Sequence, residues 1–442
     1  MSEQSNSKVL ESLKQGKEIF WPNPDLLAFE EALAKGPYSF ADVQDVENRL
    51  QRFAPFIQKA FPETVESQGI IESTVTHIPE MKEWLSTYYN QDFAGGELWL
   101  KRDDLLPISG TIKARGAIYE VLKHAETLAL EAGLLKSLDD DYSQFASEKS
   151  QNYFADYNIT VGTTGNLGIS VGTMGRALGF DVTVHMSTEA KEWKKEYLRS
   201  RGVDVVEHKT NFTRAVEEGR AASEANPRSY FVDDENSEEL FLGYTVGGYR
   251  MKHQLAEEGI QVDADHPLFV YLPCGIGGSP SGITYGLKHA FGDNVHCIFA
   301  EPTKMPSMLL GLETQKFDGI CAADIGQGGL TVADGLAVPR TSALVAKIIR
   351  YYFSAGYTLT DDTFRRLLTK LYETEGIFLE PAAVAGLLGP TQLLKTEEGQ
   401  RYLDEHSLTD KMDQATHIAW ATGGSMVPDE DKRAFVAEGQ NL

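Results

Sequence analysis

The chain has 442 residues, of which 42% are hydrophobic and 24% charged, a balance typical of a soluble globular protein with room for two or three core-forming domains. Its formal net charge of -24 would repel nucleic acid and anionic membranes, so we exclude both as expected partners. The sequence shows no segment typical of a signal peptide or a membrane-spanning helix, and its three cysteines lack metal-finger spacing. We therefore expect a cytoplasmic protein with free thiols.

The first 95 residues are predicted to be helical and rich in loops, with helical stretches at 42–50 and 81–85. This region shows no pattern with an obvious chemical role. After it, short runs of hydrophobic and β-branched residues alternate with helical patterns, which predicts a parallel sheet with helices on both faces. The predicted strands are 98–102, 157–161, 181–186, 203–207, 230–232, 268–272, 295–300 and 417–422.

Lys113 stands at the start of a predicted helix, directly after a break that contains Pro107, Ser109 and Gly110. The positive end of the helix dipole and any desolvation both disfavour an ammonium group, so we expect the pKa of Lys113 to be lowered. A neutral lysine is a nucleophile suited to a Schiff base with a carbonyl cofactor. For this stretch alone, the alternative is a lysine that simply extends its charged end into water.

Four glycines between residues 275 and 282 directly follow the predicted strand 268–272. Backbone N–H groups at such a turn, next to a helix start, can surround a phosphate, and a tight turn without a ligand is the alternative. Three other motifs do not fit. Pro280 stands where a dinucleotide-binding loop has its last glycine, no Gly-Lys-Ser/Thr closes the loop as in a P-loop, and the hydrolase pattern Gly-x-Ser-x-Gly fails around Ser279.

The turn 163–168, with the sequence Thr-Thr-Gly-Asn-Leu-Gly, follows the predicted strand 157–161. Ligands bind at the carboxyl ends of strands in such sheets, and these hydroxyl, amide and N–H groups would suit a small carboxylate. A simple helix cap is the alternative. Near the C terminus, Thr422 ends the last predicted strand and supplies a neutral hydroxyl group.

The order of these motifs resembles that of the fold-type II pyridoxal-phosphate enzymes: a Ser-x-x-x-Lys stretch, Thr-Gly-Asn-x-Gly, a glycine loop, and Thr-Gly-Gly at the last strand. Within that superfamily, the chain is similar over nearly its full length to the bacterial D-serine dehydratases. The stretches that carry this similarity are 52–56, 107–116, 233–237 and 420–424.

The resemblance implies an α/β fold of the tryptophan synthase β type, with two parallel-sheet domains that have helices on both faces. A large cofactor-binding domain would comprise 96–150 and 240–442, and a small domain would comprise 151–239. Residues 1–95 would form a helical extension that packs on the large domain. We expect a monomer, with a dimer as the alternative.

The resemblance also assigns roles to individual residues. Lys113 would hold pyridoxal 5'-phosphate through a Schiff base, Asn166 would contact the ring hydroxyl, and Thr422 would face the pyridine nitrogen. The glycine loop continues through Pro280 instead of further glycines, which leaves open which N–H groups reach the phosphate. The expected phosphate-binding residues are Gly275, Ile276, Gly277, Gly278 and Ser279, and the expected substrate-binding residues are Ser109, Thr163, Thr164, Gly165, Asn166 and Leu167.

The implied reaction is the loss of water from D-serine, which yields pyruvate and ammonia, and the same reaction would turn D-threonine into 2-oxobutanoate. Because a neutral hydroxyl at Thr422 leaves the ring nitrogen unprotonated, the ring is a weaker electron sink, which suits β-elimination. The alternatives are a threonine deaminase, a β-replacement synthase, a nicotinamide dehydrogenase and an amino-acid-binding protein without catalytic activity.

Two further features stay open at the level of the sequence. The base that takes the α-hydrogen is Thr164, which stands where related serine racemases carry an acting serine, or equally Lys113, with Asp234 a weaker candidate. Ala300-Glu301-Pro302 resembles the cation-site turn of serine-processing relatives. We therefore expect potassium or sodium at Glu301, Met305 and Ser307, with a surface-loop glutamate as the alternative.

Overall fold

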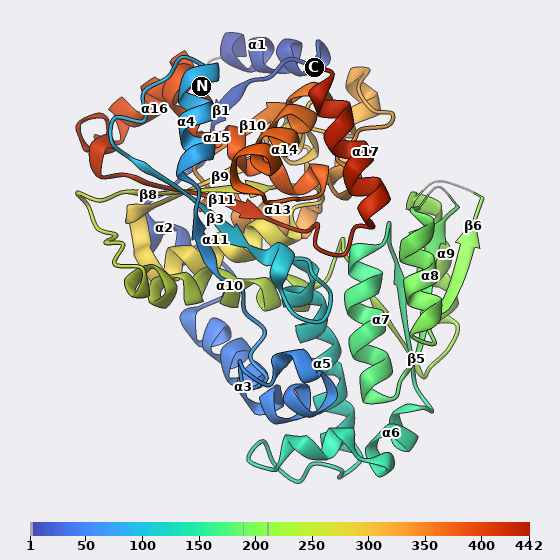
Figure 1. The fold of residues 1–442 in the computed structure, drawn as a ribbon. Helices are drawn as coiled ribbons and strands as arrows, with labels where there is room; N and C mark the ends of the chain where they lie inside the picture. Colours follow the sequence, from blue (N-terminus) through green and yellow to red (C-terminus); the bar gives the residue numbers. More distant parts are fainter. Residues whose placement is uncertain (1–2, 189, 210–211) are drawn as a thin grey trace. The chain divides into compact units, whose positions relative to one another are not determined.

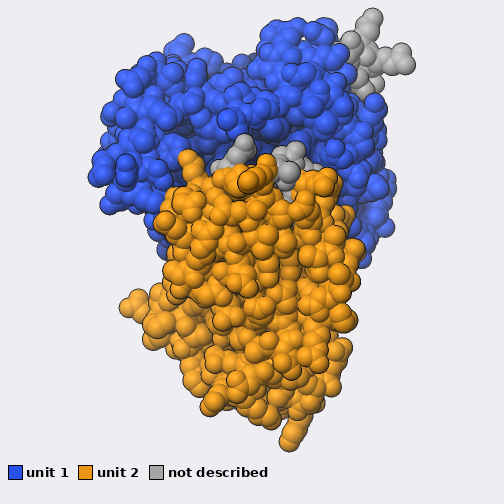
Figure 2. Space-filling view, turned by 90° about the vertical axis from the view of Figure 1, so that its right-hand side faces the viewer, with its two compact units in different colours: residues 1–40, 73–105, 247–442 blue, residues 41–72, 106–246 orange. Residues whose placement is uncertain are grey.

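The computed structural model describes residues 3–188, 190–209 and 212–442. The chain divides into two compact units, which Figure 1 shows as ribbons and Figure 2 in separate colours. Unit 1 comprises Met1–Phe40, Ser73–Leu105 and Gly247–Leu442, and unit 2 comprises Ala41–Glu72 and Leu106–Val246. Among the described residues, no helix is both long enough and apolar enough to cross a membrane. Cys274, Cys297 and Cys321 are free thiols.

Within the described residues, unit 1 contains a seven-stranded sheet of order β1-β10-β9-β8-β11-β3-β2. The five inner strands run parallel, and β1 and β2 at the edges run antiparallel to their neighbours. Every residue of β8, β9, β10 and β11 is buried, as expected for strands covered on both faces. The strands are β1 (Phe20–Pro22), β2 (Val75–His77), β3 (Glu97–Arg102), β8 (Leu268–Pro273), β9 (Val295–Pro302), β10 (Ala355–Leu359) and β11 (Thr416–Ala421).

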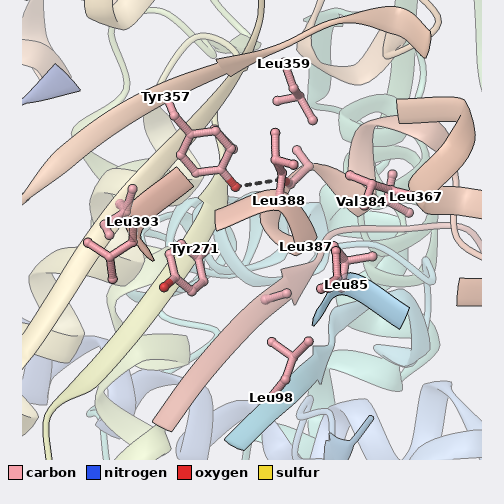
Figure 3. Packing of buried hydrophobic residues seen from close by; sticks show 14 of the residues in the cluster. Leu85, Leu98, Tyr271, Tyr357, Leu359, Leu367, Val384, Leu387, Leu388 and Leu393 are labelled. Atoms are coloured by element: carbon pink, nitrogen blue, oxygen red, sulfur yellow. Dashed lines mark hydrogen bonds between the residues drawn. The ribbon is translucent and has the colours of Figure 1, made fainter. Parts of the chain in front are cut away.

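One face of this sheet forms a hydrophobic core with the 3-10 helix η8 (Pro381–Leu388) and the helix α14 (Asp361–Glu375). Figure 3 shows Tyr271 and Tyr357 from the sheet beside Leu387 and Leu388 of η8. The Tyr357 hydroxyl donates a hydrogen bond of 2.7 Å to the Ala385 carbonyl, so this buried polar group is paired. The helices of unit 1 are α1 (Glu3–Lys14), α2 (Phe29–Leu33), α4 (Pro79–Tyr88), α11 (Gly278–Phe291), α12 (Ser307–Glu313), α13 (Ala343–Ile349), α14 (Asp361–Glu375), α15 (Gly389–Lys395), α16 (Glu397–Glu405) and α17 (Asp429–Gln440).

Unit 2 contains a four-stranded parallel sheet of order β6-β5-β4-β7. The predicted α/β class with parallel sheets is therefore confirmed. The strands are β4 (Asn158–Gly162), β5 (Asp181–Ser187), β6 (Asp204–His208) and β7 (Ser229–Val232). The helices are α3 (Phe40–Ala60), α5 (Lys113–Glu131), α6 (Glu148–Phe154), α7 (Asn166–Leu178), α8 (Glu192–Ser200) and α9 (Phe212–Glu224), and α10 (Glu238–Glu257) runs across the boundary to unit 1.

The unit boundaries differ from the domain boundaries expected from the sequence, because α3 and α5 belong to unit 2. The helix α5 packs against α7 in Figure 1. The helix α3 is tied to α5 by ion pairs of 2.6 Å from Arg49 to Glu126 and 2.8 Å from Arg52 to Glu126. Contacts between elements distant in the sequence, which local patterns do not encode, thus decide this division.

Candidate functional site

The predicted site residues fall into two groups, one in each unit, and Lys113 begins the group of unit 2. It is the first residue of α5, as predicted. Its Nζ lies 3.2 Å from Oδ1 and 3.3 Å from Oδ2 of Asp234, and the ring of Tyr244 is centred 5.9 Å from the same atom. The side chains of Lys113 and Asp234 are each 19% exposed, so the pair is largely shielded from water.

The pKa of Lys113 differs from the sequence expectation. Burial is the largest single influence and lowers the pKa of this amine, but the charge and hydrogen bonds of Asp234, together with Tyr244, outweigh it, so the net effect is a raised pKa. The expected lowered pKa is therefore wrong for the free amine. The helix start is present, but the carboxylate that reverses the shift comes from a residue 121 positions later in the chain.

Two neighbours in the sequence hold Asp234 in place. Ser237 donates a hydrogen bond of 2.8 Å to Oε2 of Glu120, a buried residue of α5. On the other side, Asp233 forms an ion pair of 2.9 Å with Arg220. Burial raises the pKa of Glu120 to about 8. The loop that carries Asp234 is thus anchored at both ends.

The stretch before Lys113 is held in a strained conformation. Ile108 has a φ of +79°, which is rare for a β-branched residue and costs on the order of 1–3 kcal/mol. The next residue, Ser109, is buried and accepts a hydrogen bond of 2.9 Å from the Ser170 hydroxyl of α7. The Thr111 hydroxyl is buried without a hydrogen-bond partner among the described residues. Strain and an unpaired hydroxyl are both typical of a binding site.

The predicted carboxylate-binding turn follows β4 and leads into α7. The Thr163 hydroxyl accepts a hydrogen bond of 3.0 Å from the Gly165 N–H, and Gly165 has a φ of +146° that favours glycine. Asn166 is the first residue of α7, so the N-terminal end of this helix lies at the turn. Thr164 and Asn166 are half-buried. The structure thus brings the expected substrate residues 163–167 together at one helix start, where N–H donors suit an anion.

The group of unit 1 begins with the glycine loop between β8 and α11. The carbonyl oxygen of Gly275 accepts a hydrogen bond of 3.1 Å from the Ser307 hydroxyl, and that of Ile276 accepts one of 3.0 Å from the Thr341 hydroxyl. In a planar trans peptide the N–H points opposite to the carbonyl. The N–H groups of Ile276 and Gly277 therefore point away from Ser307 and Thr341.

Two further donors follow in the same loop. Gly277 precedes α11 with a φ of +108°, and a Cβ atom there would lie 2.3 Å from Cε of Met308. Gly278 and Ser279 are the first residues of α11, so their N–H groups lack partners within the helix, whereas Pro280 has no N–H. The N–H groups of residues 276–279 thus form a run of donors from which phosphate oxygens can accept hydrogen bonds.

Buried polar groups around the loop also fit a phosphate ligand. The Ser281 hydroxyl, in the first turn of α11, is buried without a hydrogen-bond partner among the described residues. A buried hydroxyl without a partner costs free energy, which a ligand oxygen relieves. Thr422 directly follows β11 and is buried. Because β11 and β8 are neighbouring parallel strands, Thr422 and the glycine loop lie at the same edge of the sheet.

Glu301, the candidate cation ligand, is buried in β9. Its carboxylate accepts hydrogen bonds of 2.7 Å and 2.9 Å from the N–H groups of Met308 and Leu309. Burial raises the pKa of Glu301 to about 8. The Ser307 hydroxyl lies 3.5 Å from Glu301 and 3.1 Å from the Gly275 carbonyl, and Met305 is buried. A cation at this place stays a prediction.

Three contacts of these groups were not predicted: the Tyr244 ring beside Lys113, the hydrogen bond of Glu120 with Ser237, and that of Thr341 with the Ile276 carbonyl. Glu120 could have been noticed in the sequence, because it lies seven residues after Lys113 and therefore on the same face of the predicted helix. Tyr244 and Thr341 could not, since nothing near them in the sequence points to their partners.

Comparisons with known proteins agree with the resemblance. Residues 86–403 match the family described as pyridoxal-phosphate dependent enzyme. A probable D-serine dehydratase of Bacillus cereus (strain G9842) is 52% identical over 439 residues, which cover 99% of this chain and 98% of the relative. A probable D-serine dehydratase of Geobacillus stearothermophilus is 52% identical over 434 residues, which cover 98% of this chain and 94% of the relative.

Among solved structures, the diaminopropionate ammonia lyase from Escherichia coli in complex with D-serine has a TM-score of 0.70. It is 16% identical, and the match covers 96% of this chain and 98% of that one, so it bears on the fold. The expected fold type is therefore confirmed. The chain belongs to the family of pyridoxal-phosphate-dependent enzymes, in which near-full-length relatives at 52% identity are probable D-serine dehydratases.

Proposed function

We propose that the protein is a pyridoxal-phosphate-dependent D-serine ammonia-lyase, which converts D-serine into pyruvate and ammonia and D-threonine into 2-oxobutanoate. The observation that carries this proposal is the 52% identity to probable D-serine dehydratases over nearly the whole chain. It is supported by the presence, in the family's order, of Lys113, the turn 163–168, a glycine loop that departs from the family pattern at Pro280, and Thr422.

Lys113 would hold the cofactor covalently, and Gly275 to Ser279 would bind its phosphate through backbone N–H groups. Asn166 would contact the ring hydroxyl, and Thr422 would offer the ring nitrogen a neutral hydroxyl. When bound, pyridoxal phosphate supplies a carbonyl group for the substrate amine and a ring that withdraws electrons from the α-carbon.

The residues of unit 2 would handle the substrate and its proton. The turn 163–167 presents N–H groups and hydroxyls that suit the substrate carboxylate, and Ser109 contributes a further hydroxyl. The proton at Cα would be taken by Lys113 or Thr164, with Asp234 as the weaker candidate. Asp234 lies 3.2 Å from the Lys113 amine, so it can orient that amine and stabilise the positive charge that forms when the amine takes a proton.

Three finer points belong to the same proposal. A potassium or sodium ion would bind at Glu301, Met305 and Ser307, next to the Gly275 carbonyl that Ser307 already contacts. The protein would work in the cytoplasm, as its free thiols favour. It would act as a monomer, with a dimer as the alternative.

The test is turnover by the purified protein. We expect an absorbance band at about 410 nm from a lysine-bound pyridoxal cofactor, together with pyruvate and ammonia in equal amounts from D-serine. L-Threonine as the preferred substrate would instead indicate a threonine deaminase. A sulfur-containing product formed only with added sulfide would indicate a β-replacement synthase. Absence of the band after incubation with the cofactor would contradict the whole proposal.

A further inference from the structure

The glycine loop 275–279 accepts two hydrogen bonds from a segment that lies 65 residues later in the chain. The Thr341 hydroxyl donates a hydrogen bond of 3.0 Å to the Ile276 carbonyl, and the N–H of Ser342 donates one of 3.1 Å to the same oxygen. Thr341 is 2% exposed and Ser342 is 3% exposed, so water does not compete for these bonds. Met308 Sδ lies 3.4 Å from the Thr341 hydroxyl, but sulfur is the weaker acceptor, so the carbonyl takes the proton.

These two bonds fix the orientation of one peptide plane. A carbonyl oxygen has two lone pairs, and both are used here. Because the peptide is planar, holding the Ile276 carbonyl also fixes the direction of the Gly277 N–H on the other side. Gly277 has a φ of +108° and no side chain, so little else restricts the direction of its N–H.

The two donors differ in what else they do. Ser342 is the N-cap of α13, and its side chain accepts a hydrogen bond of 3.2 Å from the Val345 N–H. Its own backbone N–H stays in place whatever the side chain of residue 341. Of the two hydrogen bonds to the Ile276 carbonyl, the one from the Thr341 hydroxyl can therefore be removed by a substitution without disturbing the start of α13.

We infer that Thr341 is a positioning residue for the cofactor phosphate, which acts by holding the Gly277 N–H toward it. This inference rests on the proposed phosphate role of the glycine loop. Ser307 has the equivalent contact with the preceding peptide, at Gly275, but it is also a candidate cation ligand. Substitution of Thr341 therefore tests the effect of this hydrogen bond on phosphate binding without also changing the candidate cation site.

The experiment compares T341V with T369V. Valine keeps the shape of threonine and removes the hydroxyl, and Thr369 is a matched control because it is also fully buried and donates a hydrogen bond of 3.1 Å to the Val436 carbonyl. Cofactor-free protein is titrated with pyridoxal phosphate and, separately, with pyridoxal, which lacks the phosphate. Binding is followed by absorbance, and thermal unfolding of both variants without cofactor measures the loss of stability.

We expect T341V to weaken the binding of pyridoxal phosphate by on the order of tenfold, as for one lost hydrogen bond, and to leave pyridoxal binding unchanged. T369V should change neither affinity. Equal losses for both ligands, or equal effects in both variants, would show a merely structural hydroxyl and overturn the inference. If T341V does not fold, T341S, which keeps the hydroxyl, and T341A provide the same comparison.

A third variant separates the failure of this inference from that of the proposed function. G277A changes the loop itself. If G277A weakens pyridoxal phosphate and T341V does not, the loop binds phosphate without help from Thr341. If neither variant weakens it, the phosphate role of the loop is wrong, and the inference falls with it.

Discussion

The amine of Lys113 lies 3.2 Å from the Asp234 carboxylate, although 121 positions separate the two residues in the sequence. Burial lowers the pKa of Lys113, but Asp234 and Tyr244 together raise it by more, which favours a protonated amine in the cofactor-free protein. A protonated amine cannot attack a carbonyl. Covalent attachment of the cofactor should therefore become faster as the pH rises, by up to tenfold for each pH unit below the pKa of the amine.

Replacing Asp234 tests this relationship. In D234N the amine keeps its burial but loses the negative charge, so the pKa of Lys113 falls and the neutral fraction at a given pH grows. We expect the rate of appearance of the band at about 410 nm to reach its maximum at a lower pH than in the wild type. D233N is the control, because Asp233 pairs with Arg220. Superimposable pH profiles for D234N and the wild type would contradict this account.

Lys113 itself should carry the cofactor. K113A should lose both turnover and the absorbance band, because no other amine stands at the start of α5. The matched control is K123A, on the same helix, whose wild-type lysine pairs with Glu239 at 2.5 Å. Borohydride reduction of the wild-type protein followed by peptide mass spectrometry should locate the label on Lys113. A label on a different lysine would refute the assignment.

Gly277 should be required for phosphate binding more than for folding. G277A puts an L side chain at a φ of +108° and a Cβ atom 2.3 Å from Met308 Cε, which strains the loop by about 1–3 kcal/mol. We expect a loss of affinity for pyridoxal phosphate on the order of tenfold or more. G259A controls for left-handed strain alone, because Gly259 has a φ of +73° with no neighbour within 4 Å. The idea fails if both variants bind the cofactor as the wild type does.

The strands β8 and β9 could be predicted because they are buried on both faces, which gives the hydrophobic runs seen at 268–272 and 295–300. The strands β1, β2 and β10 were missed. A three-residue edge strand such as Phe20–Pro22 has no recognisable period, and Ala355–Leu359 contains a glycine that hides its strand character. The strands β1 and β10 are defined by their pairing with distant residues.

The same limit applies to the site. The positions of Lys113 at a helix start and of glycine at 277 follow from local sequence rules, and the structure confirms both. The raised pKa of Lys113 and the support of Ile276 by Thr341 arise from tertiary contacts across 121 and 65 residues. Local patterns thus identify which groups the site offers, and the fold determines their charge and direction.

A monovalent cation at Glu301 should activate the enzyme. We expect activity in a buffer of large organic cations to rise several-fold when potassium or sodium is added, because the ion would order the segment 301–309 next to the glycine loop. E301Q should lose this response. E313Q is the control, since Glu313 is another buried carboxylate and accepts a hydrogen bond of 2.7 Å from Trp21. Activity that does not depend on either ion would rule the site out.

The handedness of the substrate decides which group can reach the α-hydrogen. With the carboxylate and the amino group held in the same places, the α-hydrogen of a D-amino acid points to the face opposite to that of an L-amino acid. A threonine hydroxyl is a poor base at its ordinary pKa and needs a deprotonated neighbour. Thr164 is half-buried in the turn that the substrate carboxylate would contact, whereas Lys113 has Asp234 beside it to accept or return a proton.

T164A distinguishes these candidates through the exchange of label from α-deuterated D-serine. If Thr164 is the base, the variant should lose most of this exchange, by a factor of about 10²–10⁴, while its absorbance band at about 410 nm persists because Lys113 is intact. The control is T163V, which removes the hydroxyl that accepts the Gly165 N–H and should weaken substrate binding instead. Exchange at the wild-type rate in T164A would exclude Thr164 and leave Lys113, oriented by Asp234, as the base.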